Sequence, residues 1–156
     1  MDCMPGEKPF HILIVEDNLG DVRLMQEALR EGSVPCNLQV ATDGIEALDV
    51  LRRVPPFGAA KRPDLIFLDL NLPGISGMHV LEDIKSDPGL RQIPVIVLST
   101  SSAEQDIVDA YDRHANCYIT KPIDLEEFMR GIRLVGEFWF TMAQLPRKET
   151  QWTAMT

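Results

Sequence analysis

Short apolar runs alternate with longer amphipathic segments along the chain. The runs are rich in β-branched residues and lie at 10–15, 38–41, 65–68, 95–98 and 117–119. In three of them, with the sequences HILIV, DLIFLDL and PVIVLS, apolar residues follow one another instead of alternating with polar ones. This pattern is typical of strands that are covered on both faces of a sheet. The runs therefore predict five parallel β-strands with helices packed on either side.

The segments between these runs begin with residues that favour helix starts. Asn18, Asp43, Ser102 and Asp124 each precede a polar residue three positions later, which is the spacing of an N-cap and its partner. The alternation of strand and helix predicts a doubly wound α/β domain, in which a five-stranded parallel sheet is flanked by five helices.

The domain organisation follows from length and from the places where the pattern fades. A chain of 156 residues has the length of one domain. We expect that domain to span residues 9–145, with flexible termini at 1–8 and 146–156. The stretch VPPFGAAKRP at 54–63 has three prolines and one glycine, which predicts a long loop between the second helix and the third strand.

The last helix has more apolar surface than one flanking helix needs. Residues 124–144 predict about 21 helical residues, or roughly 31 Å, and one apolar stripe suffices to face the sheet. A second apolar group lies beside that stripe and consists of Leu134, Phe138 and Leu145 with Phe140 off the stripe. One interpretation is a wide core face. We favour exposed surface at a subunit interface, which predicts a homodimer through this helix.

Composition and charge exclude several classes of function. The chain has 45% hydrophobic and 25% charged residues, as in ordinary globular domains. A net charge of −9 disfavours direct binding to nucleic acid or anionic lipid. Three widely spaced cysteines indicate neither a disulfide framework nor a zinc site, and they fit a reducing cytoplasm. Neither a secretory leader nor a long apolar run is evident, so we expect no membrane association.

Polar residues whose side chains can bind a metal ion or take part in a reaction follow four of the five strand runs. They are Glu16, Asp17, Asp69, Ser99, Thr100 and Lys121. Because the carboxyl ends of parallel strands meet at one edge of the sheet, we expect these side chains to converge. Clustered acids repel one another and favour a hard divalent cation, for which magnesium is the expected ion. Magnesium often shares carboxylates with a phosphate, and a carboxylate so placed can form an aspartyl phosphate.

Each of these residues alone has a plainer interpretation. Glu16 and Asp17 also suit a capped helix start, Asp69 suits a turn, and a lysine before Pro122 is commonly a turn as well. Their joint placement at strand ends is what favours a functional site.

Four motifs in a fixed order extend the argument beyond single residues. They are ILIVEDN, LIFLDLNLPGISGM, PVIVLSTS and YITKP, and the similarity that they carry extends over residues 9–144. In these motifs the chain resembles the receiver domains of two-component response regulators. The resemblance implies a flavodoxin-like fold and phosphorylation of an aspartate. The loop at 54–63 is longer than in the shortest receivers. In this it is similar to the free-standing receivers that partner phytochrome-type histidine kinases.

The resemblance also implies a role for each site residue. Asp69 would accept the phosphoryl group, Asp17 would bind magnesium directly, Glu16 would bind it through water and Asn71 would lend its backbone carbonyl. Lys121 would pair with the phosphoryl oxygens, Ser99 would donate its hydroxyl to them, Thr100 would lie beside them and Tyr118 would turn inward when Ser99 moves. The bond between Lys121 and Pro122 would be cis.

The implied function is signalling rather than catalysis on an outside substrate. A sensor histidine kinase would donate the phosphoryl group, and a conformational change would relay the signal. The alternative is a pseudo-receiver that acts as a dimeric scaffold, but a scaffold has no need of clustered acids. A phosphatase with an aspartate nucleophile needs a second acid two positions later, where this chain has Asn71.

Overall fold

The computed structural model describes residues 9–146, so most of the two predicted flexible termini lies outside the described residues. In chain order the elements are β1 (Phe10–Val15), α1 (Leu19–Glu31), β2 (Cys36–Ala41), α2 (Gly44–Leu51), β3 (Leu65–Asp69), α3 (Gly77–Ser86), β4 (Val95–Ser99), α4 (Glu104–Asp112), β5 (Cys117–Thr120), α5 (Leu125–Glu137) and the π-helix η1 (Phe138–Met142). Each strand run of the sequence is a strand of the structure.

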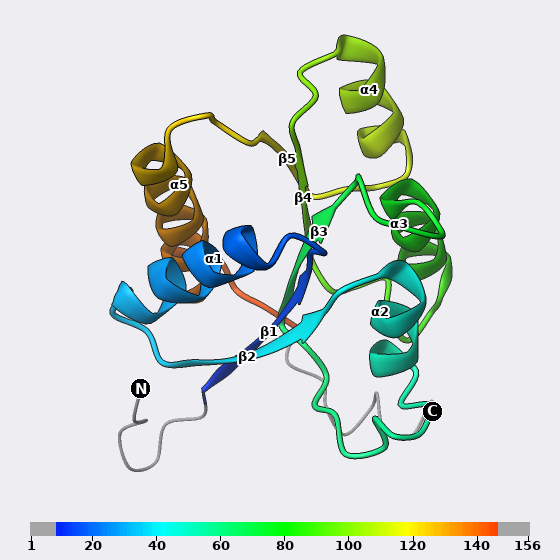
Figure 1. The fold of residues 1–156 in the computed structure, drawn as a ribbon. Coiled ribbons are helices and arrows are strands. Elements are labelled where there is room, and N and C mark those ends of the chain that lie inside the picture. The colour runs from blue at the N-terminus through cyan, green and yellow to red at the C-terminus, as the bar shows by residue number, and fades with distance from the viewer. Residues whose placement is uncertain (1–8, 147–156) are drawn as a thin grey trace.

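The five strands form one parallel sheet between two layers of helices. The strand order is β2-β1-β3-β4-β5. Helices α1 and α5 pack on one face, and α2 and α3 cover the other, as Figure 1 shows. The predicted fold class is confirmed. None of the helices within residues 9–146 is long and apolar enough to cross a bilayer.

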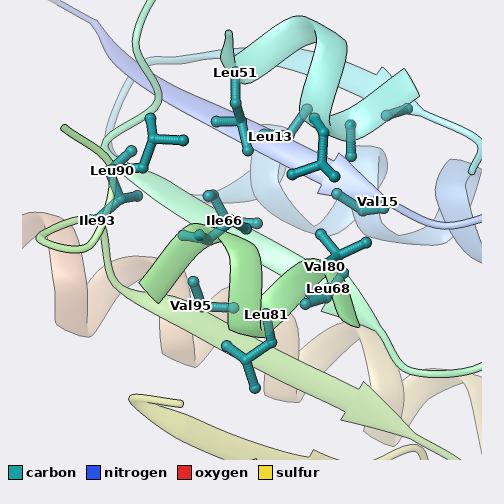
Figure 2. Packing of buried hydrophobic residues seen from close by; sticks show 14 of the residues in the cluster. Leu13, Val15, Leu51, Ile66, Leu68, Val80, Leu81, Leu90, Ile93 and Val95 are labelled. Atoms are coloured by element: carbon teal, nitrogen blue, oxygen red, sulfur yellow. The ribbon is translucent and has the colours of Figure 1, made fainter. Parts of the chain in front are cut away.

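The core consists of two apolar layers, one on each face of the sheet. Leu13 and Val15 of β1 pack in the layer under α2 and α3, which Figure 2 shows from close by. Ile12 and Ile14 point the other way, into the layer with α1 and α5. Strands β3 and β4 are buried along their whole length, which explains why their sequences are continuously apolar.

Three of the four predicted helix caps are confirmed. The side chains of Asn18, Asp43 and Asp124 accept backbone N–H bonds at the starts of α1, α2 and α5. The prediction for Ser102 is wrong, because α4 is capped by Ala103 without a side-chain bond. The hydroxyl of Ser101 instead accepts from the N–H of Ala103 and donates to Asp106, so the polar contact lies one residue earlier.

The last helix differs from the prediction in its final turns. The α-helix ends at Glu137, and residues 138–142 form a π-turn in which the N–H of Ala143 donates to the Phe138 carbonyl at 3.0 Å. This turn directs Phe140 inward, where its ring stacks on Phe10 with 4.3 Å between centroids. Phe140 and Leu145 are half-buried, whereas Leu134 and Phe138 are exposed.

Candidate metal and phosphoryl site

The residues predicted at strand ends lie at one edge of the sheet. Glu16 and Asp17 follow β1 at its carboxyl end, and Asp69 is the last residue of β3 beside it. Ser99 closes β4, and Lys121 follows β5 directly. Strand order places β3 between β1 and β4, so Asp69 has the acid pair on one side and the hydroxyl on the other.

Lys121 connects the two sides of this edge. Its ammonium donates to Glu16 Oε2 at 2.6 Å and to Asp69 Oδ2 at 3.0 Å, and its backbone N–H donates to the Ser99 carbonyl at 2.7 Å. Burial alone would lower the pKa of Lys121, but hydrogen bonds to Glu16 and Asp69 outweigh it and raise the pKa above the ordinary value. The ammonium therefore stays charged beside Asp69.

Glu16 is the most deeply buried acid of the site. One of its oxygens is bound by Lys121, and the other accepts the N–H of Asn18 at 3.0 Å. Burial raises the pKa of Glu16 to about 7, the neighbouring Asp69 adds to the increase and Lys121 opposes it. A second positive charge next to Glu16 would favour its ionised form.

The acids are arranged as a cation site requires. Glu16, Asp17 and Asp69 each offer one carboxylate oxygen, and these three oxygens lie within 4.8 Å of one another. Hard divalent cations bind such oxygen ligands, and magnesium keeps several waters. Asp17 is exposed, so solvent reaches the open side of the group. The N–H of Asn71 donates to Asp69 Oδ1 at 2.8 Å, which brings the Asn71 backbone to the same site.

The predicted switch residues are linked through one residue that the sequence did not single out. Ser99 is buried, and its hydroxyl oxygen accepts the N–H of Ser101 at 3.1 Å. The Tyr118 hydroxyl donates to the carbonyl of the same Ser101 at 2.8 Å. Ser99 and Tyr118 are thus connected by Ser101 of the β4–α4 loop. Thr100, which lies between Ser99 and Ser101 in sequence, is exposed.

Two further residues shape the site. Asp21 of α1 places Oδ2 3.0 Å from the Lys121 ammonium, although the sequence marked it only as the partner of the Asn18 cap. Gly77 begins α3, and a Cβ there would collide with the backbone of Asp69 and Leu70. The position of Gly77 in the motif that ends in SGM is the sequence feature that could have indicated its role. Glycine therefore allows α3 to start directly against the Asp69 backbone.

The expectation of a cis bond before Pro122 is wrong. Within residues 9–146, the cis peptide bond lies between Pro55 and Pro56, and the bond from Lys121 to Pro122 is not cis. The long loop expected at 54–63 is present and contains that Pro-Pro pair.

Comparison with known proteins supports the family suggested by the motifs. The profile of the response regulator receiver domain matches residues 12–133. Response regulator Rcp1 of Synechocystis sp. is 40% identical over 138 residues, which cover 88% of this chain and 94% of Rcp1. A probable methanogenesis regulatory protein of Methanothrix harundinacea, FilR2, is 37% identical over 145 residues, which cover 93% of each chain.

Solved structures agree with the sequence matches. The phosphorylated cyanobacterial phytochrome response regulator RcpA superposes with a TM-score of 0.86 at 49% identity, covering 89% of this chain and 99% of RcpA. The Mn²⁺-bound form of Rcp1 gives a TM-score of 0.85 at 40% identity, covering 88% and 99%. The resemblance to receivers of phytochrome systems is confirmed, and the chain belongs to the response regulator receiver family.

Proposed function

We propose that this chain accepts a phosphoryl group on Asp69 from a sensor histidine kinase, in a magnesium-dependent reaction, and relays the signal by a change of conformation. The observation that carries the proposal is the position of the Asp69 carboxylate. It lies beside two further acids that can share a cation with it and 3.0 Å from a charged lysine. That arrangement suits a nucleophile for phosphoryl transfer.

The chemistry of the transfer follows from the residues around Asp69. The N–H of Asn71 holds one carboxylate oxygen and thereby orients the carboxylate. An Asp69 oxygen forms the new bond to phosphorus while the bond from phosphorus to the donor imidazole nitrogen breaks, and that nitrogen keeps the electron pair. Lys121 neutralises the charge of the transferred group. Magnesium held by Glu16, Asp17 and Asp69 would neutralise the remaining charge when bound.

The conformational change would start at Ser99. A phosphoryl group on Asp69 offers acceptor oxygens beside the buried Ser99 hydroxyl, which now receives the Ser101 N–H. A move of Ser99 toward those oxygens would pull on Ser101, whose carbonyl is held by Tyr118. Thr100, the exposed residue between them, would limit the access of water to the phosphoryl group. The readout is a shift between two arrangements of this loop and Tyr118.

The proposed donor is a phytochrome-type histidine kinase. The relatives RcpA and Rcp1 support this, since the former is a phytochrome response regulator that is 49% identical. The surface around the acids also suits a protein donor, because Leu19 at the start of α1 is 71% exposed and Ile123 beside Lys121 is fully exposed. Exposed apolar side chains at the rim of a charged site favour docking of another protein.

We propose further that the chain acts in the cytoplasm, without direct contact to nucleic acid, and forms a homodimer through its last helix. Leu134 and Phe138 support the dimer, because they stay 55% and 49% exposed. The net charge of −9 supports the absence of nucleic-acid binding. The chain would be a signalling module rather than an enzyme that acts on an outside substrate.

Phosphorylation by a small acyl-phosphate donor tests the central proposal. We expect a phosphate-affinity gel to show one shifted band for the wild type with magnesium and none after chelation. Asp69→Asn should abolish that band. An equal band for Asp69→Asn would contradict the assignment of Asp69. A wild type that is never phosphorylated, yet dimerises, would favour the pseudo-receiver scaffold.

A further inference from the structure

Asp21 contacts the reactive lysine from outside the strand ends. It lies in the first turn of α1, and its carboxylate Oδ2 is 3.0 Å from the Lys121 ammonium. Its side chain is 27% exposed, so water screens the pair only partly. The contact joins residues that are 100 positions apart in sequence. The contact between Asp21 and Lys121 therefore depends on the position of α1 relative to the end of β5.

The start of α1 fixes the direction of this carboxylate. The side chain of Asn18 caps the helix by accepting the N–H of Asp21 at 3.0 Å. The backbone of Asp21 is thereby held in the first turn of α1, shortly after the end of β1. The Asp21 side chain itself remains available for Lys121.

The ammonium of Lys121 has three N–H donors and three carboxylate partners. The partners are Glu16, Asp69 and Asp21, at 2.6, 3.0 and 3.0 Å. Two of them belong to the group of described acids that can share a cation, namely Glu16 and Asp69, whereas Asp21 is outside that group. When a cation binds Glu16 and a phosphoryl group is attached to Asp69, these two carboxylates no longer interact with the lysine alone. Asp21 is then the one carboxylate of the three that still pairs only with the Lys121 ammonium.

We propose that Asp21 is a positioning residue for phosphoryl transfer: it holds the Lys121 ammonium at Asp69 while Glu16 and Asp69 are engaged by the cation and the phosphoryl group. This inference rests on the proposed function. Without Asp21, the four-carbon stem of lysine lets the ammonium swing toward solvent, and small misplacements of a positioned group slow catalysis strongly. The acid therefore acts through Lys121.

A double-mutant cycle in the full chain tests this role. Asp21→Asn keeps the size of the side chain and removes its charge. We expect it to slow phosphorylation by acetyl phosphate with magnesium by about tenfold in the wild-type background. In the Lys121→Ala background the same change should alter the residual rate by less than about twofold, because the group that Asp21 positions is gone. Asp21→Glu should recover part of the rate.

Two matched variants separate positioning from general effects of charge. Glu46→Gln removes an acid at the same position of a helix start, since its N–H binds the Asp43 cap just as that of Asp21 binds Asn18. Glu27→Gln removes an exposed acid from α1 itself. Both should leave the phosphorylation rate within about twofold of wild type, because neither lies at the Lys121 ammonium.

A spectroscopic measurement detects the contact without phosphorylation. In metal-free protein labelled with ¹⁵N, the Lys121 ammonium should give a slowly exchanging signal, identified by its loss in Lys121→Arg. Asp21→Asn should broaden or shift that signal, and Glu46→Gln should not. An active wild type whose rate and ammonium signal are unchanged by Asp21→Asn would overturn the inference. A wild type that accepts no phosphoryl group would instead overturn the proposed function.

Discussion

Glu16 and Asp17 are adjacent in sequence but differ in what their carboxylates already bind. Both oxygens of Glu16 are engaged, one by the Lys121 ammonium and the other by the N–H of Asn18, while Asp17 is exposed. Replacing a carboxylate that is free to bind the metal directly should cost more affinity than replacing one whose oxygens are already held by protein donors. We expect Asp17→Asn to weaken magnesium binding, measured by calorimetry, more than Glu16→Gln does. Equal losses in the two variants would contradict the distinction.

The raised pKa of Glu16 predicts that the proposed magnesium binding depends on pH. Its pKa of about 7 means that Glu16 is mostly charged at pH 8 and mostly protonated at pH 6 in the metal-free protein. Because a cation binds the charged form, the proton must leave, and affinity should fall by about tenfold from pH 8 to pH 6. Glu16→Gln should flatten this dependence, and Asp17→Asn should retain it. Calorimetry at the two pH values checks the sign.

At the scale of single residues, the sequence predicts the position of side chains that lie at strand ends. Glu16, Asp69 and Lys121 meet because parallel strands deliver their carboxyl ends to one edge. Asp21 and Ser101 escaped prediction for a different reason. Their contacts depend on where a helix or loop side chain points across the site, and no periodicity in the sequence records that direction.

At the scale of elements, Lys85 joins α3 to the loops that precede β4 and β5. Its ammonium donates to the carbonyls of Arg91 and Ile93 and to the Asn116 side chain, at 3.0, 2.8 and 2.9 Å. Burial lowers the pKa of Lys85 to about 8. Lys85→Met should lower the free energy of unfolding by about 2 to 3 kcal/mol, since it leaves these acceptors without their charged donor.

Urea unfolding followed by circular dichroism measures this loss. Lys61→Met is a suitable control, because Lys61 is exposed and its replacement should change the free energy of unfolding by less than about 0.5 kcal/mol. A Lys85→Met protein as stable as that control would show that the three bonds contribute nothing beyond what water offers.

Element boundaries were predictable where a single side chain sets them. Asn18, Asp43 and Asp124 cap their helices as their spacing indicates. The end of the last helix depends on packing instead. The π-turn after Glu137 comes with the stacking of Phe140 on Phe10, a contact between opposite ends of the chain that helical periodicity cannot reveal.

At the scale of the whole molecule, the last helix presents apolar side chains to solvent. Leu134, Phe138 and Met142 are exposed and follow one another at intervals of four residues, so we call them the outer patch. The sequence predicted Leu134 and Phe138 here. It did not include Met142 in this group, because the π-turn changes the direction of the residues that follow Phe138.

Dimerisation through the outer patch is the remaining prediction. Twofold symmetry would pair this surface with itself, which withdraws three large side chains from water on each protomer. Losing a central aromatic commonly costs about 2 kcal/mol or more, or roughly thirtyfold in dissociation constant. We expect Phe138→Glu to be a folded monomer that still accepts phosphate at Asp69, since Phe138 lies on the helix rather than at the strand ends.

Sedimentation velocity with and without phosphorylation tests the outer patch. Ile45→Glu is the matched control, because it places the same acid on an exposed apolar position of α2, on the opposite face of the sheet, and should leave the dimer intact. A wild type that stays monomeric in both states would refute the interface. A dimer that forms only after phosphorylation would make assembly the output of the switch, and the rearrangement at Ser99 and Tyr118 would then have to reach α5 through β5, which carries Tyr118 and leads into that helix.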